Sequence, residues 1–185
     1  MIAAHLFDEP VVLGLRSAYR GSASPAVLIP GAIDPATAAA LREAVTPQLQ
    51  EIFVADRGRY LTRAAPPELP LAEELRLLAS RIVAVPLELA EARWLIFRGG
   101  DYALFKDGAP LPACVEVTLD FSAAEVAGGE VVYARGPETL LALPSSPRSL
   151  AIVERPAGVV RQTRYLPLKQ GPAAVHRLRL VLAAR

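Results

Sequence analysis

The sequence has few residues of the kinds that build metal sites and covalent cross-links. Its 185 residues include one cysteine, Cys114, and two histidines, His5 and His176. A single cysteine excludes an internal disulfide framework and favours a reducing compartment, where a lone thiol usually behaves as a small buried hydrophobe. Neither histidine lies near Cys114 in the sequence, so a cysteine–histidine catalytic pair has no local support.

The chain also has no excess of positive or negative charge. The 20 basic residues nearly balance the 19 acidic ones, which gives a formal net charge of +1. Nucleic-acid binding needs a basic face, so this class of partner is excluded. No apolar run approaches the roughly 18 residues that cross a bilayer, and the opening MIAAHLFDEP lacks the basic start of a secretory signal. We therefore expect a cytoplasmic protein with no membrane partner.

The composition that is present predicts a packed globule. Hydrophobic residues make up 52% of the chain and charged residues 21%, so disorder is not expected. A length of 185 residues suits one domain with a proper core and is short for two. The sequence therefore predicts a single domain over residues 1–185.

The first half of the chain predicts two helices. We interpret residues 1–26 as strand and loop, with PVVLGL as a short apolar run, and 26–29 as a buried strand. Asp34 is a good N-cap and Pro35 suits the first helical position, so a helix should begin there and end near Pro47. A second helix should begin at Pro70 and close before Pro86, because its apolar residues form one stripe. The stripe consists of Leu71, Leu75, Leu78 and Ile82.

From Trp94 onward the pattern predicts strands. Eight short runs rich in Val, Leu, Ile and aromatic residues are separated by Gly and Pro, with no helical pattern between them. They are WLIF, DYALF, CVEVTL, EVVYA, TLLAL, SLAIVE, VVRQTRYL and HRLRLVLA. Such an array is typical of an antiparallel sandwich or barrel. The fold class is therefore mainly β with N-terminal helices (α+β), with a support region at 1–92 and a core at 93–185.

A series of short phrases resembles one enzyme family. In order, they are AVLIPGAIDPATAAALREAV, FRGGDYALFKD, VEVTLDFS, AGGEVVYA, LPSSPRSLAIVE, TRYLPL and VHRLRLVL. Their order and spacing resemble the prolyl-hydroxylase-like group of the 2-oxoglutarate/iron(II) oxygenases over roughly residues 26–183. The resemblance implies a double-stranded β-helix core, the jelly roll of cupin-like proteins.

The resemblance also implies a site whose iron ligands are missing here. The family binds iron(II) with two histidines and one carboxylate and holds 2-oxoglutarate with a basic residue of the last strand. Aligned on its acid, the first motif gives Asp107 as the carboxylate and Phe105 in place of histidine. Aligned on Gly100-Asp101, it gives Lys106 in place of histidine and Gly108 in place of the acid.

The second half of the implied site gives a similar result. Thr163 stands where the second histidine should be. Arg177 corresponds best to the 2-oxoglutarate or anion clamp, with Arg179 two residues further on the same strand face. Side chains alternate across a strand, so His176 should point out of the barrel if Arg177 points in. A lone carboxylate does not hold iron(II), so no metal ligand and no catalytic residue are predicted.

Other polar and aromatic residues have simpler interpretations. Glu116 and Asp120 share one face of their strand, which we interpret as an exposed polar face. Asp107 before Gly108 is typical of a turn. The aromatic residues of the region should fill the core or line the barrel. They are Trp94, Phe97, Tyr102 and Phe105.

These observations give three functional hypotheses. The first is a non-catalytic relative of the oxygenases that binds a small anionic ligand or a protein partner and needs no cofactor. The second is an active 2-oxoglutarate-dependent dioxygenase that uses Fe(II) in an atypical metal site, completed by another chain. The third is a metal-free catalyst that uses Arg177, Lys106 and Tyr165. The final strand, taken as a sheet edge, could also pair with a second copy in a homodimer.

Overall fold

The computed structural model describes residues 1–22, 24–54, 57–66, 68–104, 112–170 and 173–184. Three α-helices precede the strand-rich part of the chain: α1 (Glu9–Arg20), α2 (Pro35–Val45) and α3 (Pro70–Val83). Three short 3₁₀ helices accompany them: η1 (Ala4–Phe7), η2 (Thr46–Gln48) and η3 (Leu168–Gln170). The strands are β1 (Ala26–Ile29), β2 (Gln50–Val54), β3 (Gly58–Ala64), β4 (Leu87–Arg98), β5 (Tyr102–Ala103), β6 (Cys114–Asp120), β7 (Val131–Arg135), β8 (Glu138–Leu143), β9 (Leu150–Arg155), β10 (Val160–Thr163) and β11 (Ala174–Ala184).

Helices α2 and α3 lie where the sequence predicts them. The Asp34 carboxylate accepts a 2.8 Å hydrogen bond from the Thr37 backbone N–H, which satisfies a free donor at the start of α2. The predicted stripe of α3 is buried in the main core cluster. Helix α3 ends at Ala84, which adopts the left-handed conformation with φ 63°. Both helix predictions are confirmed.

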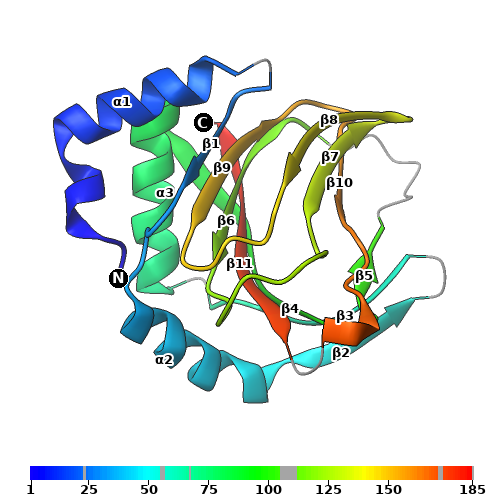
Figure 1. Ribbon diagram of the computed structural model, residues 1–185. Helices are drawn as coiled ribbons and strands as arrows, with labels where there is room; N and C mark the ends of the chain where they lie inside the picture. Colours follow the sequence, from blue (N-terminus) through cyan, green and yellow to red (C-terminus); the bar gives the residue numbers. More distant parts are fainter. Residues whose placement is uncertain (23, 55–56, 67, 105–111, 171–172, 185) are drawn as a thin grey trace.

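Helix α1 corrects the prediction of strand and loop over residues 1–26. Asp8 takes the extended N-cap conformation and Pro10 lies in the first turn, as is typical of a helix start. Val12 and Tyr19, seven residues apart, fall on one helical face and are both buried. This face packs on α3 (Figure 1). The prediction was wrong because the apolar run PVVLGL was considered without the two-turn spacing to Tyr19.

All eight strands predicted after residue 93 are present, as β4 to β11. The β2–β3 hairpin was not predicted, and β4 spans the expected boundary at residues 92 and 93. The strands form one antiparallel sheet in the order β1-β9-β6-β11-β4-β3-β5-β10-β7-β8, with β2 beside β3. The final strand is therefore not an edge, because β11 pairs with β4 on one side and with β6 on the other. This strand offers no free side to a second copy.

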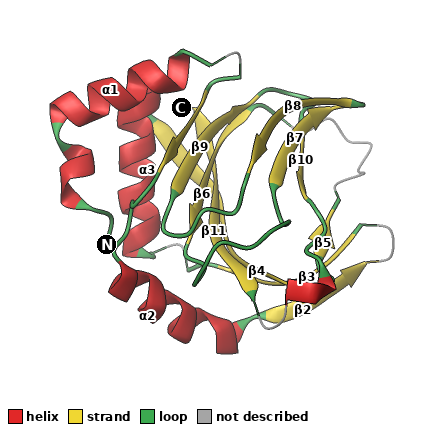
Figure 2. Cartoon of the chain, in the orientation of Figure 1, coloured by secondary structure: helices red, strands yellow, loops and turns green. Residues whose placement is uncertain are grey.

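The sheet curls into a barrel with helices on one outer face. Leu178, Leu180 and Leu182 of β11 belong to the core cluster that also holds residues of α1 and α3. These helices cover one outer side of the curled sheet (Figures 1 and 2). Contacts across the interior join strands that are not neighbours, since Glu116 of β6 reaches Tyr133 of β7. This arrangement confirms a jelly-roll core with N-terminal helices.

Among the residues that the structure describes, no helix is both long enough and apolar enough to span a membrane.

Candidate functional site

A carboxylate at the centre of the barrel holds three polar side chains. Glu116 of β6 is 2% exposed. It accepts a 2.8 Å hydrogen bond from Nε of Arg155 on β9 and a 3.1 Å bond from the Tyr133 hydroxyl on β7. Nε of Arg161 on β10 lies 3.3 Å from the second carboxylate oxygen. The expectation that Glu116 is exposed was wrong, because the apolar residues of β6 point to the helices and force its polar residues inside.

The surroundings of Glu116 keep the nearby weak acids protonated. Burial, together with the charge of Glu116, raises the pKa of Tyr133, so its hydroxyl stays a donor. Burial and Glu116 also raise the pKa of the Cys114 thiol, which accepts a hydrogen bond from Arg155. Cys114 is thus a buried, protonated thiol, as the sequence predicts.

A second buried ion pair closes one end of the interior. Asp120 accepts hydrogen bonds from the Ser122 backbone and the Ser145 hydroxyl, and its carboxylate lies 3.6 Å from Nε of Arg177. Nη1 of Arg177 donates to the Gly129 carbonyl at 2.9 Å. Burial lowers the pKa of Arg177 to about 10, and Asp120 opposes this effect, so the guanidinium is charged at neutral pH. Asp120, like Glu116, is buried and not on an exposed face.

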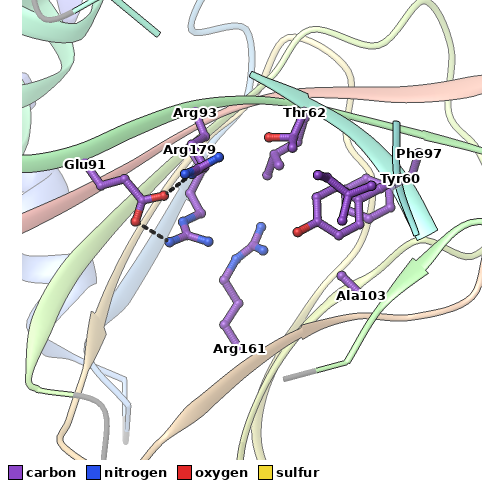
Figure 3. A pocket seen from close by; sticks show the side chains of 10 residues that line it. Tyr60, Thr62, Glu91, Arg93, Phe97, Ala103, Arg161 and Arg179 are labelled. Atoms are coloured by element: carbon purple, nitrogen blue, oxygen red, sulfur yellow. Dashed lines mark hydrogen bonds and ion pairs between the residues drawn. The ribbon is translucent and has the colours of Figure 1, made fainter. Parts of the chain in front are cut away.

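The interior opens into a cavity of about 300 Å³ between an arginine-rich wall and an aromatic wall. Glu91 lies at its mouth and pairs with Nε of Arg93 and with Nη2 of Arg179. Arg161 extends into the same space from the opposite strand (Figure 3). The residues that line it are Ile52, Tyr60, Thr62, Glu91, Arg93, Leu95, Phe97, Ala103, Arg161 and Arg179.

Several buried polar atoms on the interior face have no hydrogen-bond partner. Arg161 is 3% exposed; its Nη2 has no hydrogen-bond partner in the described part of the chain, and its Nε makes no hydrogen bond there although it lies 3.3 Å from Glu116 in an ion pair. The other unpaired interior atoms are Nε of Arg179 and the hydroxyls of Thr118 and Thr163. A buried unpaired donor costs about 1–3 kcal/mol, so each such group calls for a ligand, an ion or a water.

The residues predicted from the second motif fall on both faces of the sheet. Thr163 ends β10 and is fully buried inside the barrel, opposite Ala103. Arg177 points in and His176 points out, where its ring lies 5.7 Å from Phe121. Burial lowers the pKa of His176, which favours the neutral ring. His5 is exposed in η1.

The first motif and the aromatic residues can be placed only in part. Phe105, Lys106 and Asp107 lie outside the described residues. Trp94 faces the helices and packs edge-on against Phe121, whereas Phe97 lines the cavity. Of the third hypothesis, Tyr165 is half-exposed and Arg177 is engaged with Asp120, so these two side chains have different surroundings.

Sequence reasoning missed most of the arginines that surround the cavity. Arg93 and Arg161, which line the cavity, and Arg155, which pairs with Glu116, were not singled out. A signal was available in β11, where three alternating leucines must face the helices and leave Arg177 and Arg179 on the other side. Arg161 alternates in the same way with the outward residues of β10. The cluster could therefore be found only after the inward face of each strand was known.

Gly128 lies in the turn in which the Gly129 carbonyl accepts a hydrogen bond from Arg177. It has φ +88°, and an added Cβ would lie 2.6 Å from Cδ of Pro167. Gly136 also has positive φ but open space around it. We expect Gly136→Ala to lower the free energy of unfolding by about 1 kcal/mol, from backbone strain alone. Gly128→Ala should cost about 1–3 kcal/mol more, from the clash. Urea unfolding of both variants measures this difference, and equal losses would contradict the close approach.

Comparison with known proteins places this barrel in one structural group. No protein-family model and no curated protein sequence matches the chain. Solved structures do match. A prolyl-4-hydroxylase of Pseudomonas putida has a TM-score of 0.64 and 13% identity, over 94% of this chain and 99% of that one. An oxidoreductase of the 2OG-Fe(II) oxygenase family from Burkholderia pseudomallei has a TM-score of 0.66 and 12% identity, over 95% and 92%.

A third match is a viral collagen prolyl hydroxylase of Paramecium bursaria Chlorella virus 1, solved as a complex with 2OG. It has a TM-score of 0.63 and 11% identity, over 86% of this chain and 96% of that one. At such low identity the likeness shows the fold. The chain therefore has the fold of the 2-oxoglutarate/iron(II) oxygenases, as the motif order indicates.

The residues that the structure describes do not fit the iron centre of that fold. Both histidines of the chain lie outside the barrel, and Thr163 offers only a hydroxyl. Within the described ranges no three His, Cys, Asp or Glu side chains gather closely enough to hold a metal. The interior carboxylates Glu116 and Asp120 are already engaged by arginines. A cationic lining of this kind attracts anions and disfavours a divalent cation.

Proposed function

We propose that the barrel interior binds a small organic anion and that the protein acts as a non-catalytic relative of the oxygenases. The observation that carries this proposal is Arg161, a buried guanidinium at the cavity whose Nη2 has no hydrogen-bond partner among the described residues and whose Nε meets Glu116 only as a 3.3 Å ion pair. A guanidinium presents several donors to a carboxylate, so a carboxylate on the ligand would accept from the unpaired Nη2 while Nε stays paired with Glu116.

The charge of the interior supports the same proposal. Among the described residues that line the cavity or pair with Glu116 and Asp120, the acids are Glu91, Glu116 and Asp120, and the arginines outnumber them by five to three, with Glu91 and Arg93 partly exposed. The arginines are Arg93, Arg155, Arg161, Arg177 and Arg179. Two positive charges are therefore left for a ligand to balance. Because these groups are mostly removed from water, an anion among them interacts more strongly than it would on the surface.

Removing the Arg161 donors should remove binding. We expect the full-length protein to bind benzoate, succinate or phosphate saturably in calorimetry, and Arg161→Met to weaken that binding by roughly 10- to 100-fold. This range corresponds to about 1.5–3 kcal/mol for a hydrogen bond to a charged group. Arg63→Met removes the same charge from an exposed arginine of β3 and should leave affinity within about twofold. If none of the three anions binds, or if both variants lose affinity equally, the proposal is wrong.

Arg177 stays a candidate for the same ligand. Arg177 does not line the cavity, but burial lowers its pKa and the charge of Arg161 lowers it further, so the two guanidinium groups interact inside the barrel. A thermal-shift series with dicarboxylates tests its role. Arg177→Ala should reduce the shift if Arg177 helps to hold the anion, and an unchanged shift would remove it from the site.

Iron-dependent oxygenation is the alternative that the fold favours. It predicts stoichiometric iron in the purified protein and succinate release from 2-oxoglutarate. We expect neither, because the described part of the barrel interior offers no imidazole and its buried carboxylates are paired. Iron analysis combined with a 2-oxoglutarate turnover assay decides between the two functions. Iron together with succinate release would overturn the non-catalytic proposal.

A further inference from the structure

We infer that the ligand of this barrel is a planar aromatic carboxylate. The inference rests on the proposed function, because it assumes that the cavity takes an anion and asks what the rest of that anion must be. It follows from the two opposite walls of the cavity, which differ sharply in chemistry (Figure 3).

The wall opposite the arginines is aromatic and apolar. Tyr60 of β3 and Phe97 of β4 are stacked, with ring centroids 5.4 Å apart and an interplanar angle of 28°. Leu95 extends this surface along β4, and Ile52 covers it from β2. Phe97 is anchored in a small core cluster of the barrel, so the wall is rigid on that side. A flat ring can join such a stack at the centroid separations that aromatic pairs prefer, 4.5–7 Å.

The polar end of the ligand is fixed by Arg161. Its guanidinium extends toward the centre of the cavity, and the Tyr60 hydroxyl points toward it from the aromatic side (Figure 3). A carboxylate at this position can accept from the unpaired Nη2 of Arg161, whose Nε lies against Glu116. The ring that carries the carboxylate then lies toward Tyr60 and Phe97. One side of the cavity can therefore bind the carboxylate of a ligand, and the other side can pack against its ring.

The same two walls argue against an aliphatic dicarboxylate such as 2-oxoglutarate. A dicarboxylate that pairs one carboxylate with Arg161 and the other with Arg179 leaves the aromatic wall without a partner, and one that extends toward Phe97 and Leu95 places a charge against apolar side chains. Burying a charged group against apolar side chains is costly. The volume of about 300 Å³ lies at the lower end of small-ligand pockets, which suits an acid of one or two rings.

A series of carboxylates on the full-length protein tests the inference. Benzoate and cyclohexanecarboxylate carry the same charge and a ring of the same atom count, but only benzoate is planar. We expect benzoate to bind roughly three- to tenfold more tightly than cyclohexanecarboxylate in calorimetry, and 2-naphthoate to bind at least as tightly as benzoate. Succinate should bind more weakly than all three, because it has no ring to pack against Tyr60 and Phe97.

A pair of variants assigns the preference to the aromatic wall. Tyr60→Leu should reduce the ratio of benzoate to cyclohexanecarboxylate affinity toward one. Phe53→Leu removes an exposed ring of β2 that does not line the cavity, so the ratio should be retained. If Tyr60→Leu does not fold, the ligand series on the unmodified protein still decides.

The outcomes separate this inference from the proposal beneath it. If none of these carboxylates and no phosphate binds, the anion-binding function itself fails. If cyclohexanecarboxylate or succinate binds as tightly as benzoate, anion binding stands and the aromatic preference is wrong. If Tyr60→Leu leaves the ratio of benzoate to cyclohexanecarboxylate affinity unchanged, the ring of the ligand binds elsewhere and its assignment to the aromatic wall is wrong.

Discussion

Replacing Glu116 by glutamine should destabilise the protein by about 3–5 kcal/mol. The change leaves the guanidinium groups of Arg155 and Arg161 inside the barrel without their shared carboxylate, and an uncompensated buried charge has this effect. The side chains are 6% and 4% exposed, so water screens them little. The shift in urea midpoint at constant slope measures the loss.

The surface offers a matched control for Glu116. Glu51 also bridges two arginines, Arg59 and Arg98, but all three side chains are about half exposed. Glu51→Gln should therefore cost no more than about 1 kcal/mol. Adding Arg161→Met to the Glu116→Gln variant should recover part of the loss, because it removes one of the stranded charges. A loss at Glu116 as small as that at Glu51 would show that the interior is hydrated.

Asp120→Ala should have a comparable effect, about 3–5 kcal/mol, because it strands the Arg177 guanidinium in the interior. It also leaves the Ser145 hydroxyl and two backbone N–H groups, at Ser122 and Ser146, without an acceptor. These groups connect the end of β6 to the loop before β9. The free energy of unfolding from urea titration gives the magnitude.

Replacing Arg177, the other partner of this ion pair, should reduce the free energy of unfolding by less than replacing Asp120. Arg177→Met removes the charge but leaves Asp120 with three donors, so its carboxylate stays hydrogen-bonded. We expect Arg177→Met to cost less than half of the loss caused by Asp120→Ala. The reverse order would mean that Arg177, and not Asp120, organises this end of the barrel.

Local signals were sufficient for much of the fold. Asp34 and Pro35 mark the start of α2 by chemistry that needs no tertiary context, and the stripe of α3 is fully regular. The eight later strands are separated by Gly and Pro residues that no strand interior tolerates well. The order of the family-like phrases then selected the jelly roll. Helix α1 was not predicted because only two of its residues, Val12 and Tyr19, are buried and they lie seven residues apart, and Gly14 between them does not favour a helix.

The candidate site could not be derived in the same way. Whether Glu116 faces solvent or the barrel depends on which side of β6 the helices cover, and that is a property of the whole sheet. Glu116, Thr118 and Asp120 share one face of β6 whether that face points to solvent or into the barrel, so the sequence pattern does not distinguish the two arrangements. Arg161 looks like any strand arginine until β10 is placed opposite β6. The motif positions drew attention to Arg177 and Thr163, while two of the unpaired interior atoms lie on Arg161, which no motif indicated.

The position of β11 between β4 and β6 has a consequence for how the barrel forms. Every other strand precedes β11 in the chain, and its partners on β4 are more than 75 residues away in sequence. Contacts of such long range are slow to form, since the intervening loop must close before any of them is made. The arginines of the interior therefore stay hydrated until β11 inserts, and dehydration of the cluster and closure of the barrel should occur as one late kinetic event.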